Sequence, residues 1–306
     1  MPQRPCVRIA LYATAALSCA LHAPAEAQGA KPGDVTASAS LSGFTQFDTD
    51  LDSGGNFHWG GGLASGRIAR QFTPQASAGL TVRYDYQEWK FEAPTAFGGV
   101  APWDHLNAPS IGLNLGYTYA TDLQFGVTPT VEWSYESGAK TSDALTYGAV
   151  ATIAKVYSPD LVLGLGVSVF RRINETKALP FLIVNWKIND RWRVANPFQA
   201  GPAGGGGLEL VYAPDDHWEF AGGATYRSYR FRLREDGPTP NGIGENSFIP
   251  VFARISRTLT EKLRFDFYAT IQTAAKLTVD NANGSGRYSE DYKIAPGMGA
   301  TLAYRF

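Results

Sequence analysis

The chain has 306 residues, and its 27 basic and 28 acidic side chains give a net charge of −1 at pH 7. This balance excludes the basic excess that is typical of nucleic-acid-binding proteins. Charged residues make up only 18% of the chain, whereas aromatic residues reach 13% and there are 33 glycines. A helical protein rich in Leu, Glu and Lys is therefore excluded, and the order of the residues must identify the fold.

Residues 1–27 have the features of a secretory signal peptide. Arg4 and Arg8 precede an apolar stretch over residues 9–21, which is too short to span a bilayer. Ala25 and Ala27 flank Glu26 in the small-x-small pattern of a cleavage site, so we expect cleavage before residue 28.

An alternative interpretation is lipid attachment at Cys19, although Ala16 stands where the usual motif has Leu. Cleavage after Ala27 removes both cysteines, so the mature chain would form no disulfide and no thiolate metal site. We expect residues 28–35 to form a short periplasmic segment and residues 36–306 to form one domain. No run of 18 apolar residues follows the signal, so no transmembrane helix is predicted.

The remaining chain alternates apolar and polar side chains with a period of two. Between residues 123 and 135 the odd positions are mostly apolar and the even positions are Gln, Gly, Thr, Glu and Ser, and residues 111–119 and 262–272 alternate in the same way. Strands of a membrane barrel show this pattern because one face meets lipid and the other the lumen. We therefore expect Phe265 and Phe267 to point outward and Arg264 and Asp266 inward.

Short turns alternate with longer connections along the chain, as in an up-and-down barrel with tight periplasmic turns and longer outer loops. The sequence thus predicts an all-β, antiparallel transmembrane β-barrel of about 14 strands. The predicted strands are 36–47, 57–72, 76–91, 110–120, 122–135, 143–157, 161–174, 178–188, 191–197, 207–213, 217–234, 247–259, 262–279 and 291–306. The ninth and tenth are short, and 12 strands remain an alternative.

The residue pairing across each hairpin tests this scheme, because lipid-facing residues of one strand must lie opposite lipid-facing residues of the next. A turn at residues 259–261 would place Arg254 directly opposite Asp266 inside the barrel. Segments 57–72 and 217–234 fit less well, since Phe231 and Leu233 have the opposite parity to the apolar residues near residue 220. Either a bulge near Tyr226 or a strand that extends above the membrane explains this.

The last strand ends with alternating Leu302, Tyr304 and Phe306. This ending resembles the C-terminal signal of bacterial outer-membrane barrels, and that resemblance implies recognition by the barrel-assembly machinery and periplasmic chaperones. Residues 190–235, which include the segment DRWRVANPF from residue 190 and YRSYRF from residue 226, look like a family of predicted outer-membrane proteins of unassigned function. That second resemblance implies the location in the outer membrane and assigns no activity and no functional residue.

Ten charged residues stand at the alternate strand positions whose side chains are expected to face the lumen. Mixed charges in a lumen either tune conduction or pair with one another and fill the barrel, and both interpretations stay open. The predicted lumen residues are Arg83, Asp85, Glu132, Glu209, Arg227, Arg254, Arg264, Asp266, Lys293 and Arg305.

Two constellations near the first loop suggest other chemistry. His58, with Ser53 or Asp52 nearby, would fit a lipid-active barrel enzyme if a serine and an acid converged on the histidine. Asp48, Asp50 and Asp52 would offer hard oxygen ligands to calcium, although a solvated acidic loop is the simpler interpretation. Neither pattern is specific, so no catalytic residue, metal or cofactor is predicted.

The sequence predicts an outer-membrane barrel exported through the Sec pathway into the envelope of a Gram-negative bacterium. A passive pore for small solutes is the first functional hypothesis, with the 92–109 loop folded inward as a constriction. A lipid-active enzyme and a structural or adhesion barrel with a filled lumen are the alternatives. The expected partners are outer-membrane lipid and lipopolysaccharide, and the solute is unknown.

Overall fold

The computed structural model describes residues 31–120, 122–197 and 206–306. Residues 1–27, with the predicted cleavage site at Ala25 and Ala27, lie outside the described residues. The strands are β1 (Val35–Asp50), β2 (Asn56–Gln71), β3 (Ala76–Glu92), β4 (His105–Tyr119), β5 (Leu123–Trp133), β6 (Tyr135–Glu136), β7 (Leu145–Ser158), β8 (Leu161–Arg172), β9 (Glu175–Lys187), β10 (Trp192–Ala195), β11 (Gly207–Tyr212), β12 (Trp218–Thr225), β13 (Arg227–Arg232), β14 (Ile243–Thr258), β15 (Leu263–Asp280), β16 (Tyr288–Tyr292) and β17 (Ala295–Arg305). Two 3₁₀ helices, η1 (Thr95–Phe97) and η2 (Thr141–Ala144), lie in loops.

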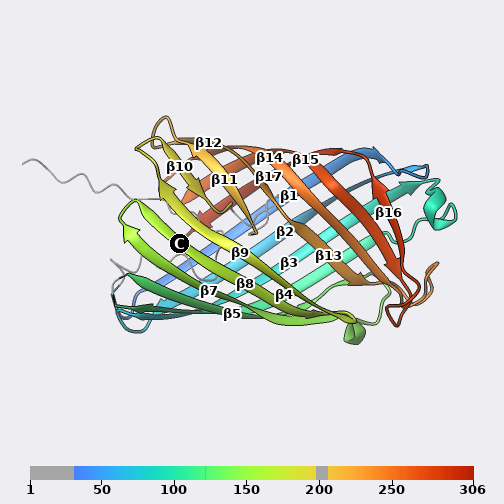
Figure 1. Cartoon of the computed structure of the whole chain (residues 1–306), viewed down its shortest axis with the longest axis horizontal. Coiled ribbons are helices and arrows are strands. Elements are labelled where there is room, and N and C mark those ends of the chain that lie inside the picture. The colour runs from blue at the N-terminus through green and yellow to red at the C-terminus, as the bar shows by residue number, and fades with distance from the viewer. Residues whose placement is uncertain (1–30, 121, 198–205) are drawn as a thin grey trace, which may run out of the picture.

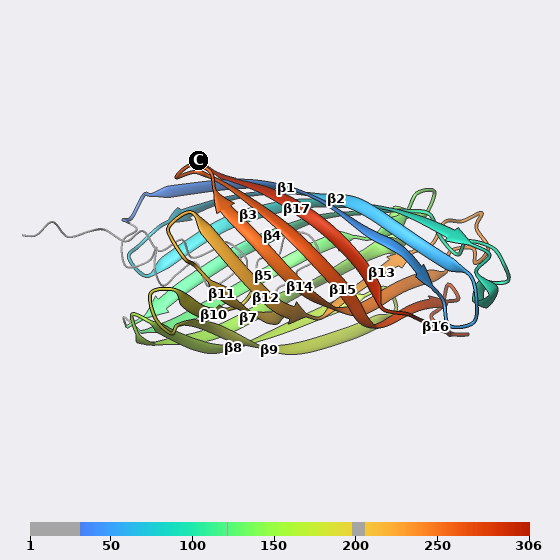
Figure 2. The ribbon, with the colours of Figure 1, turned by 90° about the horizontal axis from the view of Figure 1, so that it is seen from above.

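The strands form one closed barrel (Figures 1 and 2). The described residues make 14 strands, because β5 and β6, β12 and β13, and β16 and β17 each continue one strand across a short break. The first strand closes the ring by pairing with both β2 and β17, so that Ser40 lies opposite Ser65 on one side and Ala303 on the other. The prediction of 14 strands is confirmed, including the short β10 and β11.

The two ends of the barrel differ in their connections. The short-turn end, at the left of Figure 1, carries the start of β1, the end of β17 and tight turns such as the one between β2 and β3. The long-loop end, at the right, carries η1 and η2.

In the described ranges, no helix has the length and apolar character needed to cross a membrane.

The alternation along the strands separates two environments. Phe265 and Phe267 are 38% and 40% exposed on the outer wall, whereas Asp266 between them is 1% exposed. Many large apolar side chains from other strands are exposed in the same way, among them Leu165, Val251 and Met298. A water-soluble protein rarely exposes so wide an apolar surface. The wall is therefore an apolar band suited to hydrocarbon, and the chain folds as a transmembrane β-barrel.

At the long-loop end, apolar residues occupy the inward-facing strand positions, and large aromatic rings therefore point into the barrel. We call this buried cluster the aromatic plug. Two of its three tryptophans, Trp59 and Trp89, stack with ring centroids 5.0 Å apart, and the third, Trp103, meets Phe231 edge-on at 5.1 Å. The rings of the plug are Phe57, Trp59, Trp89, Phe91, Phe97, Trp103, Phe231, Phe248 and Tyr292.

The plug explains why segments 57–72 and 217–234 departed from the expected pattern. The register between β12–β13 and β14 is the same on both sides of Tyr226, with Ala224 opposite Val251 and Arg227 opposite Phe248. No extra residue is inserted against β14, so the proposed bulge near Tyr226 is wrong. Phe231 faces inward instead, because this end of the barrel is filled with apolar side chains rather than water.

The last hairpin also corrects a predicted contact. Thr258 pairs with Arg264 and the Leu259 N–H donates to the Leu263 carbonyl, so the turn comprises residues 260–262 rather than 259–261. Arg254 consequently lies opposite Tyr268, not Asp266. The parity is unchanged by this two-residue difference, and the long arginine side chain still approaches Asp266 to 3.5 Å.

The short strands β10 and β11 leave part of the wall without a full backbone ladder. Within the described residues, β10 pairs with only three residues of β9, from Asn185 to Lys187. The buried side chain of Asn196 continues the connection, accepting a hydrogen bond from the Val184 N–H at 2.9 Å and donating to the carbonyls of Leu182 and Gly207 at 2.8 and 2.9 Å. A side-chain amide thus replaces a rung of the sheet where backbone groups must not be left unpaired.

Candidate functional site

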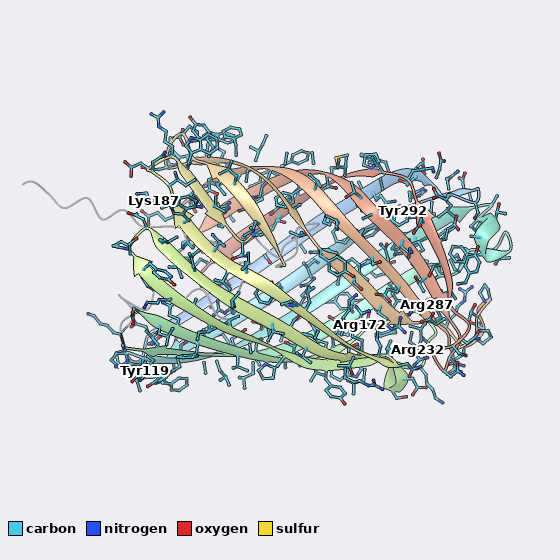
Figure 3. The ribbon with its side chains drawn as sticks, viewed as in Figure 1. Tyr119, Arg172, Lys187, Arg232, Arg287 and Tyr292 are labelled. Carbon is cyan, nitrogen blue, oxygen red and sulfur yellow. The ribbon has the colours of Figure 1, made fainter. Side chains whose placement is uncertain are left out.

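A cavity of about 260 Å³ lies inside the barrel, and we call it the chamber. Strands β3, β5, β7 and β8 form one wall of the chamber, and β13 forms the facing wall. The side chains that line it are Arg83, Glu132, Ser134, Thr146, Arg172, Tyr226, Arg227, Ser228, Tyr229 and Arg230. Figure 3 shows Arg172 in the half of the barrel nearer the long-loop end.

The strand register sets the order of charges on the curved wall. Arg83 on β3 lies opposite Ser110 on β4, Ser110 lies opposite Glu132 on β5, and Glu132 lies opposite Thr146 on β7. Adjacent strands are about 4.8 Å apart, so Arg83 and Glu132 are separated by roughly 10 Å of wall. The small hydroxyl side chains at the intervening positions leave the space of the chamber open.

Two arginines of the chamber, Arg172 on β8 and Arg230 on β13, are held by carboxylates behind them. Arg172 donates to Glu245 at 2.8 Å and to the Ser228 hydroxyl at 2.8 Å. Arg230 donates to Glu245 at 3.0 Å and to Asp280 at 3.1 Å. Arginines fixed in this way present a preorganised cationic surface to the chamber.

Glu132 differs from the other charged residues of the chamber. In the described part of the chain it makes no hydrogen bond or ion pair, although Arg83 and Arg172 flank it along the wall. An acidic group without a partner in a barrel interior carries a desolvation cost. Glu132 is therefore the one acidic group on the chamber wall that makes no direct hydrogen bond or ion pair within the described residues.

A second charged cluster, the Arg254 network, fills the lumen nearer the short-turn end. Arg254, which is 2% exposed, donates to Glu209 at 2.7 Å. Arg264 donates to Glu219 at 2.8 Å and to Asp266 at 2.9 Å, and Glu219 also accepts from Arg193 at 2.8 Å. The chamber is thus bounded by the aromatic plug on one side and by this network on the other.

The structure divides the ten predicted lumen residues into groups. Arg83, Glu132 and Arg227 line the chamber, with Asp85 buried 3.5 Å from Arg83. The four residues Glu209, Arg254, Arg264 and Asp266 belong to the Arg254 network.

Two of the ten lie elsewhere. Arg305 keeps the inward parity but is exposed at the short-turn end. Lys293 lies at the long-loop rim, where it bonds Asp52 at 2.6 Å, because the break between β16 and β17 interrupts the alternation there.

Sequence reasoning missed several residues that complete these clusters. Glu219 shares the inward parity of Arg227 on the same strand, so a stricter use of parity would have found it. Arg172 likewise follows the inward positions of β8. Arg230, Glu245 and Asp280 lie where both faces of their strands are buried, so no alternation marks them.

The residues considered for other chemistry are paired at the long-loop rim. His58 Nδ1 lies 2.8 Å from Asp48 Oδ1 on the outer surface. The Ser53 hydroxyl donates to Glu290 at 2.7 Å instead of approaching His58. No group of three or more His, Cys, Asp or Glu side chains that could hold a metal ion occurs within residues 31–120, 122–197 and 206–306, so Asp48, Asp50 and Asp52 do not converge there.

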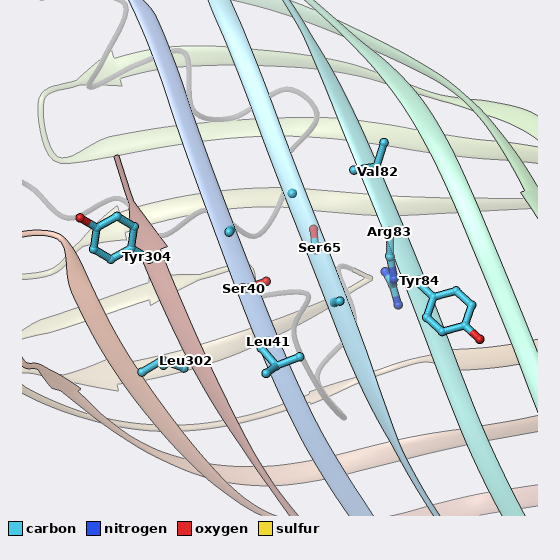
Figure 4. A pocket seen from close by; sticks show the side chains of 11 residues that line it. Ser40, Leu41, Ser65, Val82, Arg83, Tyr84, Leu302 and Tyr304 are labelled. Carbon is cyan, nitrogen blue, oxygen red and sulfur yellow. The ribbon is translucent and has the colours of Figure 1, made fainter.

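A hollow also indents the outer wall over β1, β2, β3 and β17 (Figure 4). Small residues such as Ala64 and Gly66 contribute to its surface, and the exposed side chains of Leu41, Tyr84 and Leu302 surround it. These side chains face the apolar surroundings of the barrel, so the hollow belongs to the membrane-facing surface. Tyr304, which also lines it, packs edge-on against Phe306 at 4.9 Å, and the role of Leu302, Tyr304 and Phe306 in assembly stays a prediction.

No protein-family model matches the chain, and the comparison with curated proteins gives no match. Solved structures with a similar outline include a FadL homologue from Pseudomonas aeruginosa, with 11% identity over 92% of this chain and 94% of the other and a TM-score of 0.47. An outer-membrane channel from Pseudomonas putida F1 has 11% identity over 91% and 97% and a TM-score of 0.45. The toluene transporter TodX from Pseudomonas putida has 11% identity over 92% and 91% and a TM-score of 0.42.

Proposed function

We propose that the protein is an outer-membrane channel of a Gram-negative bacterium that passes small polar solutes and is closed in this conformation. The observation that carries the proposal is the chamber, a cavity inside a closed barrel lined by guanidinium, carboxyl and hydroxyl groups. A concave site with a few polar groups facing a shared space is the usual form of a small-molecule site. We assign the short-turn end to the periplasm and the long-loop end to the outside, as in barrels of this topology.

The loop between β3 and β4 supplies the closing element at the outer end. Its Trp103 is 1% exposed and contacts Trp89 and Phe91 with centroid distances of 5.5 Å each. Phe97 of η1 meets Phe91 at 6.4 Å. Trp103 thus points into the barrel, whereas residues 98–100 of the loop are exposed. This inward ring supports a channel whose entrance opens when the loop leaves the barrel.

The test is to replace residues 95–102 with a short Gly-Ser linker and to mutate Trp103→Ser. Single-channel currents in planar bilayers should rise well above those of the unmodified protein, because the two rings that the loop adds to the plug, Phe97 and Trp103, are removed. Val100→Ser is the matched control, since Val100 is exposed in the same loop. Folding of each variant is checked by its resistance to SDS without heating.

The absence of any current in folded protein, both before and after the loop is replaced, would favour a barrel with a filled lumen. That alternative is supported by the plug and by the Arg254 network, which occupy both sides of the chamber. Such a barrel would act through its outer loops as a structural or adhesive protein. A lipid-active enzyme has less support, because the His58–Asp48 pair has no serine hydroxyl bonded to it in the described residues.

A further inference from the structure

We infer that the chamber binds a small zwitterion, a solute that carries both a carboxylate and an ammonium group. This inference deepens the proposed function and, as a statement about the transported solute, rests on it. The chamber walls show the two complementary surfaces that such a solute requires. One is the set of arginines, and the other is Glu132.

The arginine side of the chamber fits a carboxylate. Arg172 and Arg230 approach from β8 and β13, and each is held by Glu245 through a bond of 2.8 or 3.0 Å. Arg172 also donates to Glu175 at 2.9 Å. Arg230 also donates to Asp280 at 3.1 Å and to the Ile173 carbonyl at 2.9 Å. A guanidinium has five N–H donors, so within the described residues Nη1 of Arg172 and both terminal nitrogens of Arg230 each retain an N–H for another oxyanion. The hydroxyl of Ser228, which bonds both Arg172 and Glu245, lies on the same side.

Glu132, in contrast to the arginines, requires a positively charged group on the solute. Its neighbours in the register row are Ser110 and Thr146, which provide hydroxyl groups but no charge. Arg83 already pairs with Asp85 at 3.5 Å, and Arg172 with Glu245. An ammonium group placed between Ser110 and Thr146 would give Glu132 the direct ion pair that the described residues do not supply.

A simple anion satisfies only half of this site. A monocarboxylate would find the arginines but would leave Glu132 without a cation in the same small space. A simple amine would meet Glu132 but would face the cationic surface of Arg172 and Arg230. The volume of about 260 Å³ lies below the usual range for drug-sized ligands, so the solute is of the size of a small amino acid.

The probe is alanine, compared with propionate and ethylamine, which keep only its carboxylate or only its amine. Binding is measured by equilibrium dialysis with radiolabelled solute on the refolded full-length barrel in detergent, at one pH and ionic strength. We expect alanine to bind about tenfold more tightly than either single-charge analogue, since each lost charge-assisted hydrogen bond costs about that factor.

The diagnostic variant is Glu132→Gln, which keeps the side-chain shape and removes the charge. It should lower alanine affinity about tenfold and leave propionate binding unchanged or stronger. Glu88→Gln is the matched control, because Glu88 is half-exposed outside the chamber and pairs with Lys90 at 3.3 Å. Equal binding of alanine and propionate, no saturable binding of alanine, or an unaltered preference in Glu132→Gln would each overturn the inference.

Uptake into liposomes separates this inference from the proposed function. Saturable alanine binding without any passage of solute would reject the channel and leave the zwitterion site standing. Passage of all three solutes at equal rates, with no saturable binding, would support a channel and reject the site.

Discussion

At the scale of single residues, Asn196 completes a wall that two short strands leave unfinished. Its amide bonds three backbone groups from β9 and β11, at Leu182, Val184 and Gly207. In a membrane barrel, water cannot replace such bonds within the hydrocarbon region.

We expect Asn196→Ala to lower the free energy of unfolding by about 1–3 kcal/mol, the usual cost of leaving buried polar groups unpaired. Urea unfolding of the protein refolded into vesicles measures the change. Asn283→Ala is the control, because Asn283 is exposed and bonds only within its own turn to Ser285. Equal stability of both variants would show that Asn196 is not a structural rung.

The ionisation of Glu136, at the long-loop end, makes the stability of the protein depend on pH. This residue lies above the apolar band, opposite Leu106, and accepts the N–H groups of Asp104 and Arg234 at 3.1 and 2.9 Å. Burial raises the pKa of Glu136 to about 7, even though these bonds and the Arg234 charge favour the ionised form.

The raised pKa means that the folded protein holds this proton more tightly than the unfolded chain. The resulting stabilisation is fully present below pH 4.5, the ordinary pKa of a glutamate side chain, and is lost as the pH rises through about 7. Glu136→Gln should therefore remove a decline in unfolding free energy seen between roughly pH 5 and pH 8. Unfolding midpoints across that range test it, with Glu88→Gln as control, and matching pH profiles for Glu136→Gln and the unmodified protein would contradict it.

At the scale of elements, strand pairs inside the barrel use glycine to accept a ring from the neighbouring strand. Gly166 on β8 lies opposite Phe181 on β9, and Gly244 on β14 lies opposite Phe231 on β13. A Cβ atom built at either glycine would overlap the facing ring. These glycines therefore set how closely the aromatic side chains lie against the wall.

We expect Gly166→Ala to destabilise the barrel by about 1–3 kcal/mol, because the Phe181 ring must move away from an already filled space. Gly43→Ala is the matched control, since a Cβ at Gly43 meets no atom within 4 Å and its substitution should change stability by less than about 0.5 kcal/mol. Thermal unfolding of both variants in the same detergent measures the difference. Equal losses of stability in the two variants would mean that Phe181 is not tightly packed against Gly166.

At the scale of the whole molecule, the plug, the chamber and the Arg254 network lie in series along one lumen. Any solute that crosses the barrel must pass the three acidic residues of the network, Glu209, Glu219 and Asp266, which Arg254 and Arg264 neutralise.

We therefore expect Arg254→Ala and Arg264→Ala to shift the open channel toward cation selectivity, because each leaves carboxylates without their counter-charge. Reversal potentials in planar bilayers under a salt gradient measure the shift, in the background that lacks the plug loop. Arg257→Ala is the control, since Arg257 lies on the outer face over the Trp218 ring. Selectivity unchanged by both lumen variants would reject their assignment to the conduction path.

The sequence by itself determined the barrel and the side of the wall on which most residues lie. The period of two along β15, with Phe265 outward and Asp266 inward, needs only the pleat of a strand between lipid and lumen. The count of 14 strands followed from the same local signal, and so did the assignment of Arg254 and Glu209 to the lumen.

Only the tertiary structure decided what fills the lumen. Whether Arg254 faces Asp266 or Tyr268 depends on a two-residue difference in the strand pairing. A shift of two residues leaves the same side chains facing the lumen, so the alternation of apolar and polar residues cannot reveal it. The convergence of Phe57, Trp103 and Phe231 depends on strands far apart in the chain meeting around a closed ring. A periodic pattern reports which solvent each face meets, but contacts across the lumen arise from closure of the barrel, which no local segment encodes.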